Sequence, residues 1–346
     1  MKENYFLGGY TRRINQGLSS ITFNSQAETF TERELIDNIQ NPTYLALSKD
    51  NHYLFTIEKE EPFSGVAVYK KNNNDTWIKK DYFYHTQAAG CHLFYLDSKK
   101  ALYLSNYHEG TIEIYKFNDD EIKHLQTITH EGSSVHPNQT QSRIHFASAF
   151  NQDEFLYVCD LGSDKVYVYS LAENGSIAHL EQTISVPAGT GPRHLEIHPN
   201  QKFVYIIGEL NNTTILCHLK KNGHLEIIDS YSNISPDSHP KASGAAIKIS
   251  NDGNFLYVST RYQDQITLFR VDQTSGKLTH LQDISSYGKV PRDFCLSLDE
   301  HYLIAAHQDS DNLSLFKRDS KSGKLSFINK DTYAPECVCI LGIPNT

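Results

Sequence analysis

The sequence lacks any long apolar run. Its first residues, Met1–Tyr5, contain no apolar stretch that would precede a cleavage site. No later segment approaches the ~18 uninterrupted apolar residues that a membrane-spanning helix needs. We therefore expect a soluble, cytoplasmic protein that has no membrane partner.

An excess of positive charge is also lacking. The 346 residues include 32 Lys and Arg against 41 Asp and Glu, which gives a formal net charge of -9 at pH 7. A nucleic-acid surface usually concentrates basic residues on one face. The basic pairs here are instead scattered along the chain, at Arg12-Arg13, Lys70-Lys71 and Lys99-Lys100. We expect these pairs to be solvated and the protein to have no nucleic-acid partner.

Several motifs that carry chemistry are absent. None of the cysteines has C-x-x-C spacing, so buried and reduced thiols are expected; they are Cys91, Cys159, Cys217, Cys295, Cys337 and Cys339. The 17 histidines form neither H-x-H nor H-E-x-x-H, and the acidic ring that calcium favours is missing, so we expect no metal and no cofactor. The absence of G-x-S-x-G and Walker sequences argues against a serine nucleophile and a phosphate loop.

A repeated pattern of strands and turns occupies nearly the whole chain. An aromatic-aliphatic strand recurs six times at intervals of 48, 54, 48, 52 and 47 residues, centred on Leu54, Leu102, Leu156, Val204, Leu256 and Leu303. Counting back another 47 residues reaches Leu7, which gives seven units. A period of about 40–50 residues built of strands is typical of a radial array with a central channel. The sequence predicts an all-β fold: one seven-bladed β-propeller domain over residues 1–346, with four-stranded antiparallel blades.

Each repeat predicts a four-stranded meander. Period-two alternation and turns such as Asn251-Asp252-Gly253 indicate β-hairpins. In the clearest repeat the strands span Arg193–Ile197, Phe203–Gly208, Thr213–Leu219 and Leu225–Tyr231. Helical periodicity is nearly absent, and the segment Thr31–Leu35 predicts either one short helical turn or a polar loop.

Strands from both ends of the chain are expected to close the ring. An open propeller would leave the edges of its first and last blades unpaired. The segment Cys337–Ile340 is a candidate inner strand, and Tyr5–Tyr10 and Leu18–Phe23 supply further strands. The seventh blade should therefore combine the two termini.

Aligning the repeats identifies positions that share one face of the disc. In an antiparallel meander, the start of the first strand and the end of the second lie at the same edge of the sheet. Eleven residues before the strand centres lie Thr43, Cys91, His145, Arg193, Ala245 and Arg292. Five residues after the centres lie Lys59, Tyr107, Leu161, Glu209, Arg261 and Gln308. A purely structural position would repeat its residue type, so this variation predicts a functional site at one mouth of the channel.

Charged and titratable residues concentrate at these positions in four consecutive repeats. Several arginines suit an anionic small molecule, because each offers bidentate donors to phosphate or carboxylate. Glu209 or His145 is a candidate general base. The predicted catalytic residues are Glu209, His145, Arg193 and Arg261, and the predicted substrate-binding residues are Arg292, Gln308, His92 and Tyr107.

Structural roles are the alternatives for some of these residues. Arg193 and Glu209 are also interpretable as an ion pair that ties one blade together, and His145 as a packing residue. His92 and His194 come one residue later in the register, so their side chains should face the other side of their strands. His194 is interpreted as structural, whereas the role of His92 stays open.

The segment Gly191–Asn200, which reads GPRHLEIHPN, and Gly208-Glu209-Leu210 resemble the signature of the seven-bladed propeller 6-phosphogluconolactonase family. Further similarity covers almost the whole chain, including Gly8-Gly9-Tyr10-Thr11 and His307–Asn312. This family's proposed active site has one histidine, two arginines and one glutamate at a channel mouth. The resemblance implies these roles for His145, Arg193, Arg261 and Glu209. The chain departs from the family pattern at Gly208, Thr260, Ser142 and Asp293.

These observations support more than one function. The leading hypothesis is hydrolysis of 6-phosphoglucono-1,5-lactone or a similar anionic sugar lactone. In it, Arg193 and Arg261 hold the phosphate or polarise the oxyanion, and Glu209 or His145 activates water. One alternative is a non-catalytic propeller that binds an anionic ligand or a protein partner. Another is a metal-dependent lactonase or a quinone dehydrogenase.

Overall fold

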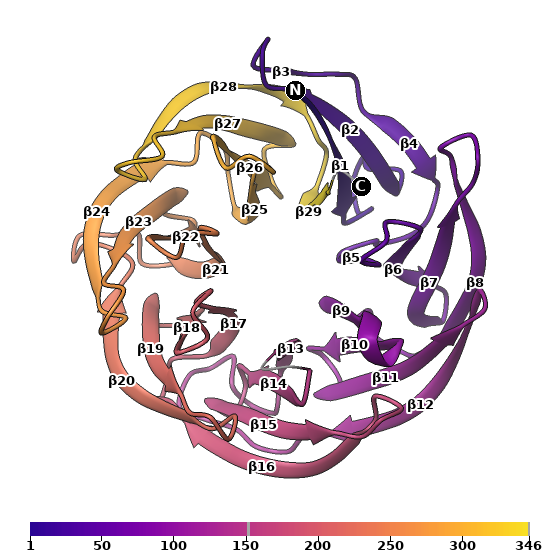
Figure 1. Ribbon diagram of the computed structural model, residues 1–346, viewed down its shortest axis with the longest axis horizontal. Coiled ribbons are helices and arrows are strands. Elements are labelled where there is room, and N and C mark those ends of the chain that lie inside the picture. The colour runs from indigo at the N-terminus through magenta and orange to yellow at the C-terminus, as the bar shows by residue number, and fades with distance from the viewer. Residues whose placement is uncertain (151–152, 345–346) are drawn as a thin grey trace.

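Seven antiparallel sheets are arranged as blades around a central axis (Figure 1). The structure is a computed structural model and describes residues 1–150 and 153–344. In six of the blades the first strand lies nearest the centre and the later strands follow outward in chain order (Figure 1). The predicted seven-bladed propeller with four-stranded blades is therefore confirmed. Among the described residues, no helical segment has the length and apolar character of a membrane span.

Six blades each use four consecutive strands. The first blade consists of β5 (Leu45–Leu47), β6 (Tyr53–Glu60), β7 (Phe63–Lys71) and β8 (Trp77–Thr86). The second consists of β9 (His92–Leu96), β10 (Ala101–Asn106), β11 (Thr111–Asn118) and β12 (Glu121–Thr129), with a 3-10 turn at Asp97–Lys99. The third blade consists of β13 (Ile144–Phe150), β14 (Phe155–Asp160), β15 (Lys165–Leu171) and β16 (Ile177–Ser185). The fourth consists of β17 (Pro192–Ile197), β18 (Phe203–Gly208), β19 (Thr213–Leu219) and β20 (Leu225–Ser232). The fifth blade consists of β21 (Ser243–Ile249), β22 (Phe255–Arg261), β23 (Gln265–Val271) and β24 (Leu278–Ser285). The sixth consists of β25 (Pro291–Leu296), β26 (Tyr302–His307), β27 (Asn312–Arg318) and β28 (Leu325–Tyr333).

The seventh blade joins the two termini, as predicted. Its strands are β29 (Cys337–Ile343), β1 (Lys2–Gly9), β2 (Leu18–Asn24), β3 (Thr29–Phe30) and β4 (Glu34–Asp37). β29 is innermost and pairs with β1 through partners such as Leu7 and Ile340. Residues 31–33, between β3 and β4, form a polar loop rather than a helical turn, whereas Glu34 and Leu35, which were also expected in a turn or loop, begin β4.

Hydrophobic cores lie between neighbouring blades. The seven clusters of buried apolar side chains each combine residues of two adjacent sheets, and one of them unites the last blade with the N-terminal strands. Burial of apolar surface between the sheets holds neighbouring blades together. The six cysteines are unpaired thiols; four are buried as expected, whereas Cys91 and Cys295 are partly exposed.

A hydrogen bond from one blade to the next recurs four times. The tyrosine beside a strand-two centre donates its hydroxyl to a glycine carbonyl in the outer turn of the following blade, at 2.7–2.8 Å. The pairs are Tyr103 with Gly175, Tyr157 with Gly223, Tyr205 with Gly276, and Tyr257 with Gly323. These glycines have φ between 72° and 88°, a region that glycine adopts readily. The repeated aromatic residues are thus explained by contacts that join the blades.

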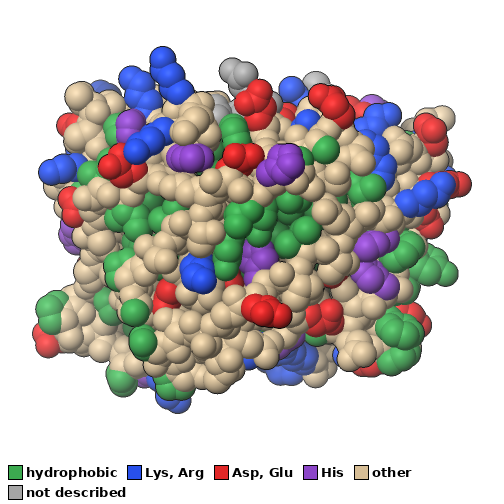
Figure 2. Space-filling view, turned by 90° about the horizontal axis from the view of Figure 1, so that it is seen from below, with side chains coloured by type: hydrophobic (Ala, Val, Ile, Leu, Met, Phe, Trp, Pro, Cys, Tyr) green, Lys and Arg blue, Asp and Glu red, His purple; other side chains and the backbone are tan. Residues whose placement is uncertain are grey.

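The outer surface carries charges of both signs. Figure 2 views the disc from its edge and shows basic and acidic side chains interspersed there. Lys70 is ion-paired with Asp120 across two blades at 2.9 Å, and Lys71 with Asp75 at 2.8 Å. These pairs are exposed enough that each contributes little to stability.

Candidate active site

β-Bulges build one mouth of the channel. The innermost strands β13, β17 and β25 each contain one extra residue relative to the partner strand, and these residues are His145, Arg193 and Arg292. A bulge bends its strand and re-aims a side chain. A bulge therefore orients the side chain at three of the positions that the sequence alignment of the repeats had placed at one face.

The predicted residues line a cavity at this mouth. Its volume is about 540 Å³, which is in the usual range for small-molecule sites. Glu209, His145, Arg261, Arg292 and Tyr107 all contribute to its wall, as do the other aligned residues Thr43, Lys59 and Cys91. Arg193 lies beneath it in a smaller recess that Arg292 and Cys91 also line, and it reaches the carboxylate of Glu209. The alignment thus identified most of this wall.

Glu209 is held between two guanidinium groups. Its Oε2 lies 3.0 Å from Nε of Arg193 and 2.9 Å from Nη2 of Arg261. Burial opposes ionisation of this carboxyl, but Arg261, Arg193 and Arg292 outweigh that effect and lower its pKa. Glu209 follows β18 directly, and its N–H donates to the carbonyl of Gly191, which fixes the backbone there. Both guanidinium contacts are made by Oε2, and Glu209 lines the cavity.

Both arginines also donate hydrogen bonds to β21, which lies in the blade after that of Arg193 and in the same blade as Arg261. Arg193 donates from Nη1 to the carbonyl of Ala245 at 2.6 Å. Arg261 donates from Nη2 to Ser243 Oγ at 2.6 Å and to the carbonyl of Gly244 at 3.2 Å. Burial, with the neighbouring guanidiniums, lowers the pKa of Arg193 to about 10, so it stays protonated at neutral pH. The ion pair that was interpreted as a structural tie therefore exists, and its carboxylate partner Glu209 lines the cavity.

His145 is buried beside this group in its neutral form. Burial lowers the pKa of the imidazole well below 6.5, and Arg193, Arg292 and Arg261 lower it further. Its ring meets those of Tyr107 at 5.9 Å and His194 at 5.2 Å. Within the described part of the chain, Nδ1 has no hydrogen-bond partner. A neutral imidazole with an unoccupied nitrogen can accept a proton from water.

Two predicted substrate-binding residues do not line this cavity. His92 packs one layer deeper, against Phe146 at 4.3 Å and His194 at 5.3 Å, and lines a separate cavity of about 310 Å³ towards the other face. The side chain of Gln308 accepts a 3.5 Å bond from Arg292 and donates to Asp309 at 3.0 Å. Arg292 and Tyr107 are in the cavity wall as predicted. His194, interpreted as structural, is a buried packing residue with rings on several sides.

The alignment missed two residues of the loop after β1. Tyr10 and Arg12 line the cavity, with the Arg12 guanidinium 3.8 Å from the centre of the Tyr10 ring. The guanidinium of Arg292 also lies over that ring, at 5.7 Å. Arg12 is exposed, but it belongs to the cavity mouth rather than to an unspecialised surface. The resemblance already included Tyr10 in Gly8-Gly9-Tyr10-Thr11, and this was the available signal.

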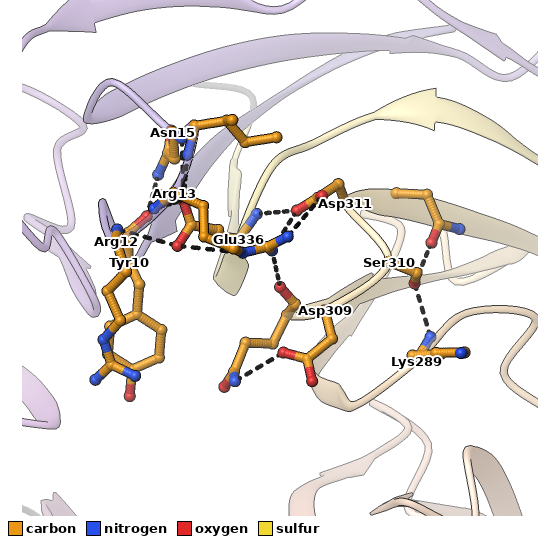
Figure 3. A network of polar contacts seen from close by, with 12 residues as sticks. Tyr10, Arg12, Arg13, Asn15, Lys289, Asp309, Ser310, Asp311 and Glu336 are labelled. Carbon is orange, nitrogen blue, oxygen red and sulfur yellow. Dashed lines mark hydrogen bonds and ion pairs between the residues drawn. The ribbon is translucent and has the colours of Figure 1, made fainter.

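Glu336 holds this loop in place (Figure 3). Its carboxylate accepts hydrogen bonds from four successive backbone N–H groups at 2.9–3.1 Å, those of residues 12 to 15. Burial opposes its ionisation, but these donors outweigh it and lower the pKa of Glu336. Arg13 adds an ion pair to Asp311 at 2.8 Å. The C-terminal part of the chain thus positions Tyr10 and Arg12 from more than 300 residues away.

Known proteins share this chain's fold and length. The family model described as "Lactonase, 7-bladed beta-propeller" matches residues 4–342. A 6-phosphogluconolactonase of Bacillus subtilis is 30% identical over 84% of this chain and 83% of its own length. A crystal structure of a Lactobacillus plantarum protein is 34% identical, with a TM-score of 0.96 over 99% of this chain and 100% of that chain. The periplasmic gluconolactonase of Pseudomonas aeruginosa is 23% identical and shares the fold, with a TM-score of 0.94 over 99% of both chains. The chain therefore belongs to the seven-bladed β-propeller lactonase family.

Proposed function

We propose that the protein hydrolyses an anionic sugar lactone, and that this substrate is 6-phosphoglucono-1,5-lactone. The observation that carries this proposal is the Glu209 carboxylate held between Arg193 and Arg261 beside a neutral His145, at the wall of a cavity of about 540 Å³. The relative in Bacillus subtilis is named for the same reaction. This concave site also favours a small molecule over a flat protein-docking surface.

Positive charge in the cavity suits an anionic substrate. Arg12, Arg261 and Arg292 line it, and Arg193 lies just below. Glu209 neutralises part of this charge. The guanidinium of Arg12 stacks on Tyr10, which leaves its N–H donors directed to solvent or to a ligand. A phosphate bound by such donors would orient the lactone ring for attack.

The residues supply the elements of lactone opening. Water attacks the lactone carbonyl carbon, the carbonyl oxygen becomes an oxyanion, and the bond to the ring oxygen then breaks to give a carboxylate and a hydroxyl group. Oε1 of Glu209 accepts the water proton in our proposal, and His145 is the alternative acceptor. Arg261 and Arg193 stabilise the negative charge as it moves from the carboxylate to the oxyanion. The proton finally passes to the leaving ring oxygen, and the second proton of the attacking water is released to solvent as the new carboxylic acid ionises at neutral pH.

Replacing Glu209 tests the base assignment. In Glu209→Gln, kcat should fall by roughly 10²–10⁴-fold because the proton acceptor is lost while the shape is kept. Glu196→Gln is a matched control, since Glu196 is on β17 of the same blade but pairs with Lys248 at 2.9 Å and lines the other cavity. Lactone consumption would be followed by proton release and corrected for spontaneous hydrolysis. Normal turnover in Glu209→Gln with slow turnover in His145→Gln would transfer the base role to His145.

Comparing two lactones tests the substrate class. The phosphorylated lactone should have a higher kcat/KM than glucono-1,5-lactone, and Arg12→Met with Arg292→Met should reduce that preference because the cationic donors to the phosphate are lost. Equal kcat/KM values for the two lactones would contradict a phosphate site. Tight binding of 6-phosphogluconate without turnover of either lactone would instead favour the non-catalytic binding function.

A further inference from the structure

A second group of chemically active side chains lies far from the channel. His85 is on β8, Glu113 on β11 and His124 on β12. β8 and β12 are the outer strands of neighbouring blades, and Figure 1 shows them side by side at the rim of the disc. The lactone cavity uses none of these residues. Among the described residues, only this group brings three potential metal-binding side chains together.

The ligand atoms are spaced as in a tetrahedral metal site. Nε2 of His85 lies 3.0 Å from Oε2 of Glu113, and Nε2 of His124 lies 3.2 Å from the same oxygen. One ligand atom from each of the three side chains lies within 4.8 Å of the others. Zinc bonds of about 2.0–2.1 Å in a tetrahedron separate neighbouring ligand atoms by roughly 3.3 Å. A small closure of the two imidazoles would therefore complete this geometry.

A β-bulge creates this arrangement on the strand surface. The register of β11 and β12 shifts after Ile114, so that Tyr115 opposes His124 and Leu125 is the extra residue. His124 and Thr127 consequently lie on the same face of the sheet as Glu113, with Nε2 of His124 3.0 Å from the Thr127 hydroxyl. His85 then approaches from the adjacent blade.

Neighbouring rings orient the two imidazoles. The Tyr115 hydroxyl lies 3.5 Å from Nδ1 of His85, which leaves Nε2 of His85 as the nitrogen that faces Glu113. The Phe83 ring stacks on His124 with centroids 6.0 Å apart. Such contacts around metal-binding histidines fix the ring orientation and increase affinity.

The group is buried on one side and open on the other. The Glu113 side chain is 3% exposed, whereas those of His85 and His124 are 30% and 28% exposed. An ion therefore has access from solvent, and water can occupy a fourth position.

We propose that His85, Glu113 and His124 bind a zinc ion. Two imidazole nitrogens and one carboxylate oxygen suit zinc, whereas calcium and magnesium take oxygen ligands. A bound ion would join the outer strands of two blades and should stabilise the ring there. The spacing of 28 and 11 residues between the ligands, in different blades, explains why no short sequence motif revealed the site.

Titration of the metal-free protein with Zn²⁺ tests this proposal. Calorimetry should give one ion per chain for the wild type, and His85→Gln, His124→Gln and Glu113→Gln should each weaken binding at least roughly tenfold. His280→Gln is a matched control, because His280 forms a 3.1 Å pair with Asp283 near the outer strand of another blade without a second imidazole. Zn²⁺ should also raise the melting temperature of the wild type and the control only.

Titration with Co²⁺ identifies the ligand type. Visible absorption typical of nitrogen and oxygen ligands in a tetrahedral site should appear in the wild type and disappear in the folded His85→Gln and His124→Gln variants. Intense near-ultraviolet bands from thiolate ligands would place the ion on cysteine and overturn the proposal. Unchanged Zn²⁺ affinity in both histidine variants would also overturn it. Lactone turnover, measured in parallel, should be the same in all these variants, which separates this site from the proposed function.

Discussion

Two sets of equivalent positions in the blades behave in opposite ways. At the outer position, where the second strand of one blade meets the outer turn of the next, four blades repeat one contact: a tyrosine hydroxyl donates a hydrogen bond to a glycine carbonyl of the next blade. At the inner bulge, three blades carry His145, Arg193 and Arg292, and the residues differ in kind. The outer contact is the same in these four blades because neighbouring blades pack against each other with the same geometry each time. The inner residues differ because they face one shared cavity rather than seven similar joints.

The comparison separates stability from function. A blade-to-blade hydrogen bond contributes to folding wherever it occurs, so the same residue is suitable at every copy. A ligand in the channel touches several blades at once and needs a different group from each of them. The constant positions of the repeat therefore form the scaffold, and the positions at which the residue type varies identify the site.

Among the changes that test this comparison, Arg261→Gln should produce the largest effect. Loss of the guanidinium that contacts Glu209 at 2.9 Å should lower kcat/KM for the lactone by about 10²–10³-fold, as when one preorganised donor to an oxyanion is removed. Arg270→Gln is the control, because Arg270 is exposed on β23 of the same blade and stacks on Phe255. Steady-state kinetics would measure both variants. Similar losses in both would mean that the inner and outer positions do not differ in function.

Tyr205→Phe should have an intermediate effect, on stability alone. Its hydroxyl donates to Gly276 at 2.8 Å, so the free energy of unfolding should fall by about 1–3 kcal/mol because a buried carbonyl loses its donor. Urea unfolding would measure this change, and kcat/KM should stay at the wild-type value. Tyr82→Phe is the control, since that ring is 56% exposed. A change in lactone turnover without loss of stability would break the distinction between the two positions.

The acid-induced loss of stability that one histidine just inside the mouth contributes should be the smallest effect. Burial, with nearby positive charges, holds the pKa values of His92, His145 and His194 well below 6.5 in the folded protein. Below pH 6.5 the unfolded chain therefore binds protons that the folded chain does not, and stability falls as the pH falls. Each group should contribute a loss of about 1.4 kcal/mol at pH 5.5 relative to pH 7.5.

Comparison with His194→Gln isolates one of these groups. Urea unfolding at pH 7.5 and pH 5.5 should show a smaller acid-induced loss in the variant than in the wild type. An equal loss in both proteins would mean that His194 does not stay neutral in the folded channel.

Much of the fold was predictable because its signals are local. Alternating side chains and polar turns located the strands from Pro192 to Ser232 to within about one residue. The aligned register found Glu209, His145 and Arg261, since antiparallel pairing brings their strand ends to one edge. The same register included Gln308, which instead bonds to Arg292 and Asp309. The register position of His92 already indicated that its side chain faces the other side of its strand, and it lines the second cavity instead of the first.

The sequence by itself determined the strands, their order, the closing blade and the ring of aligned residues. These depend on side-chain alternation, turn chemistry and a constant period, all of which are properties of neighbouring residues. Only the tertiary structure decided how those residues pair: Glu209 between two arginines, the loop with Tyr10 held by Glu336, and His85 beside His124 across two blades. Such contacts join distant parts of the chain through bulges and blade packing, and no local pattern encodes their distances.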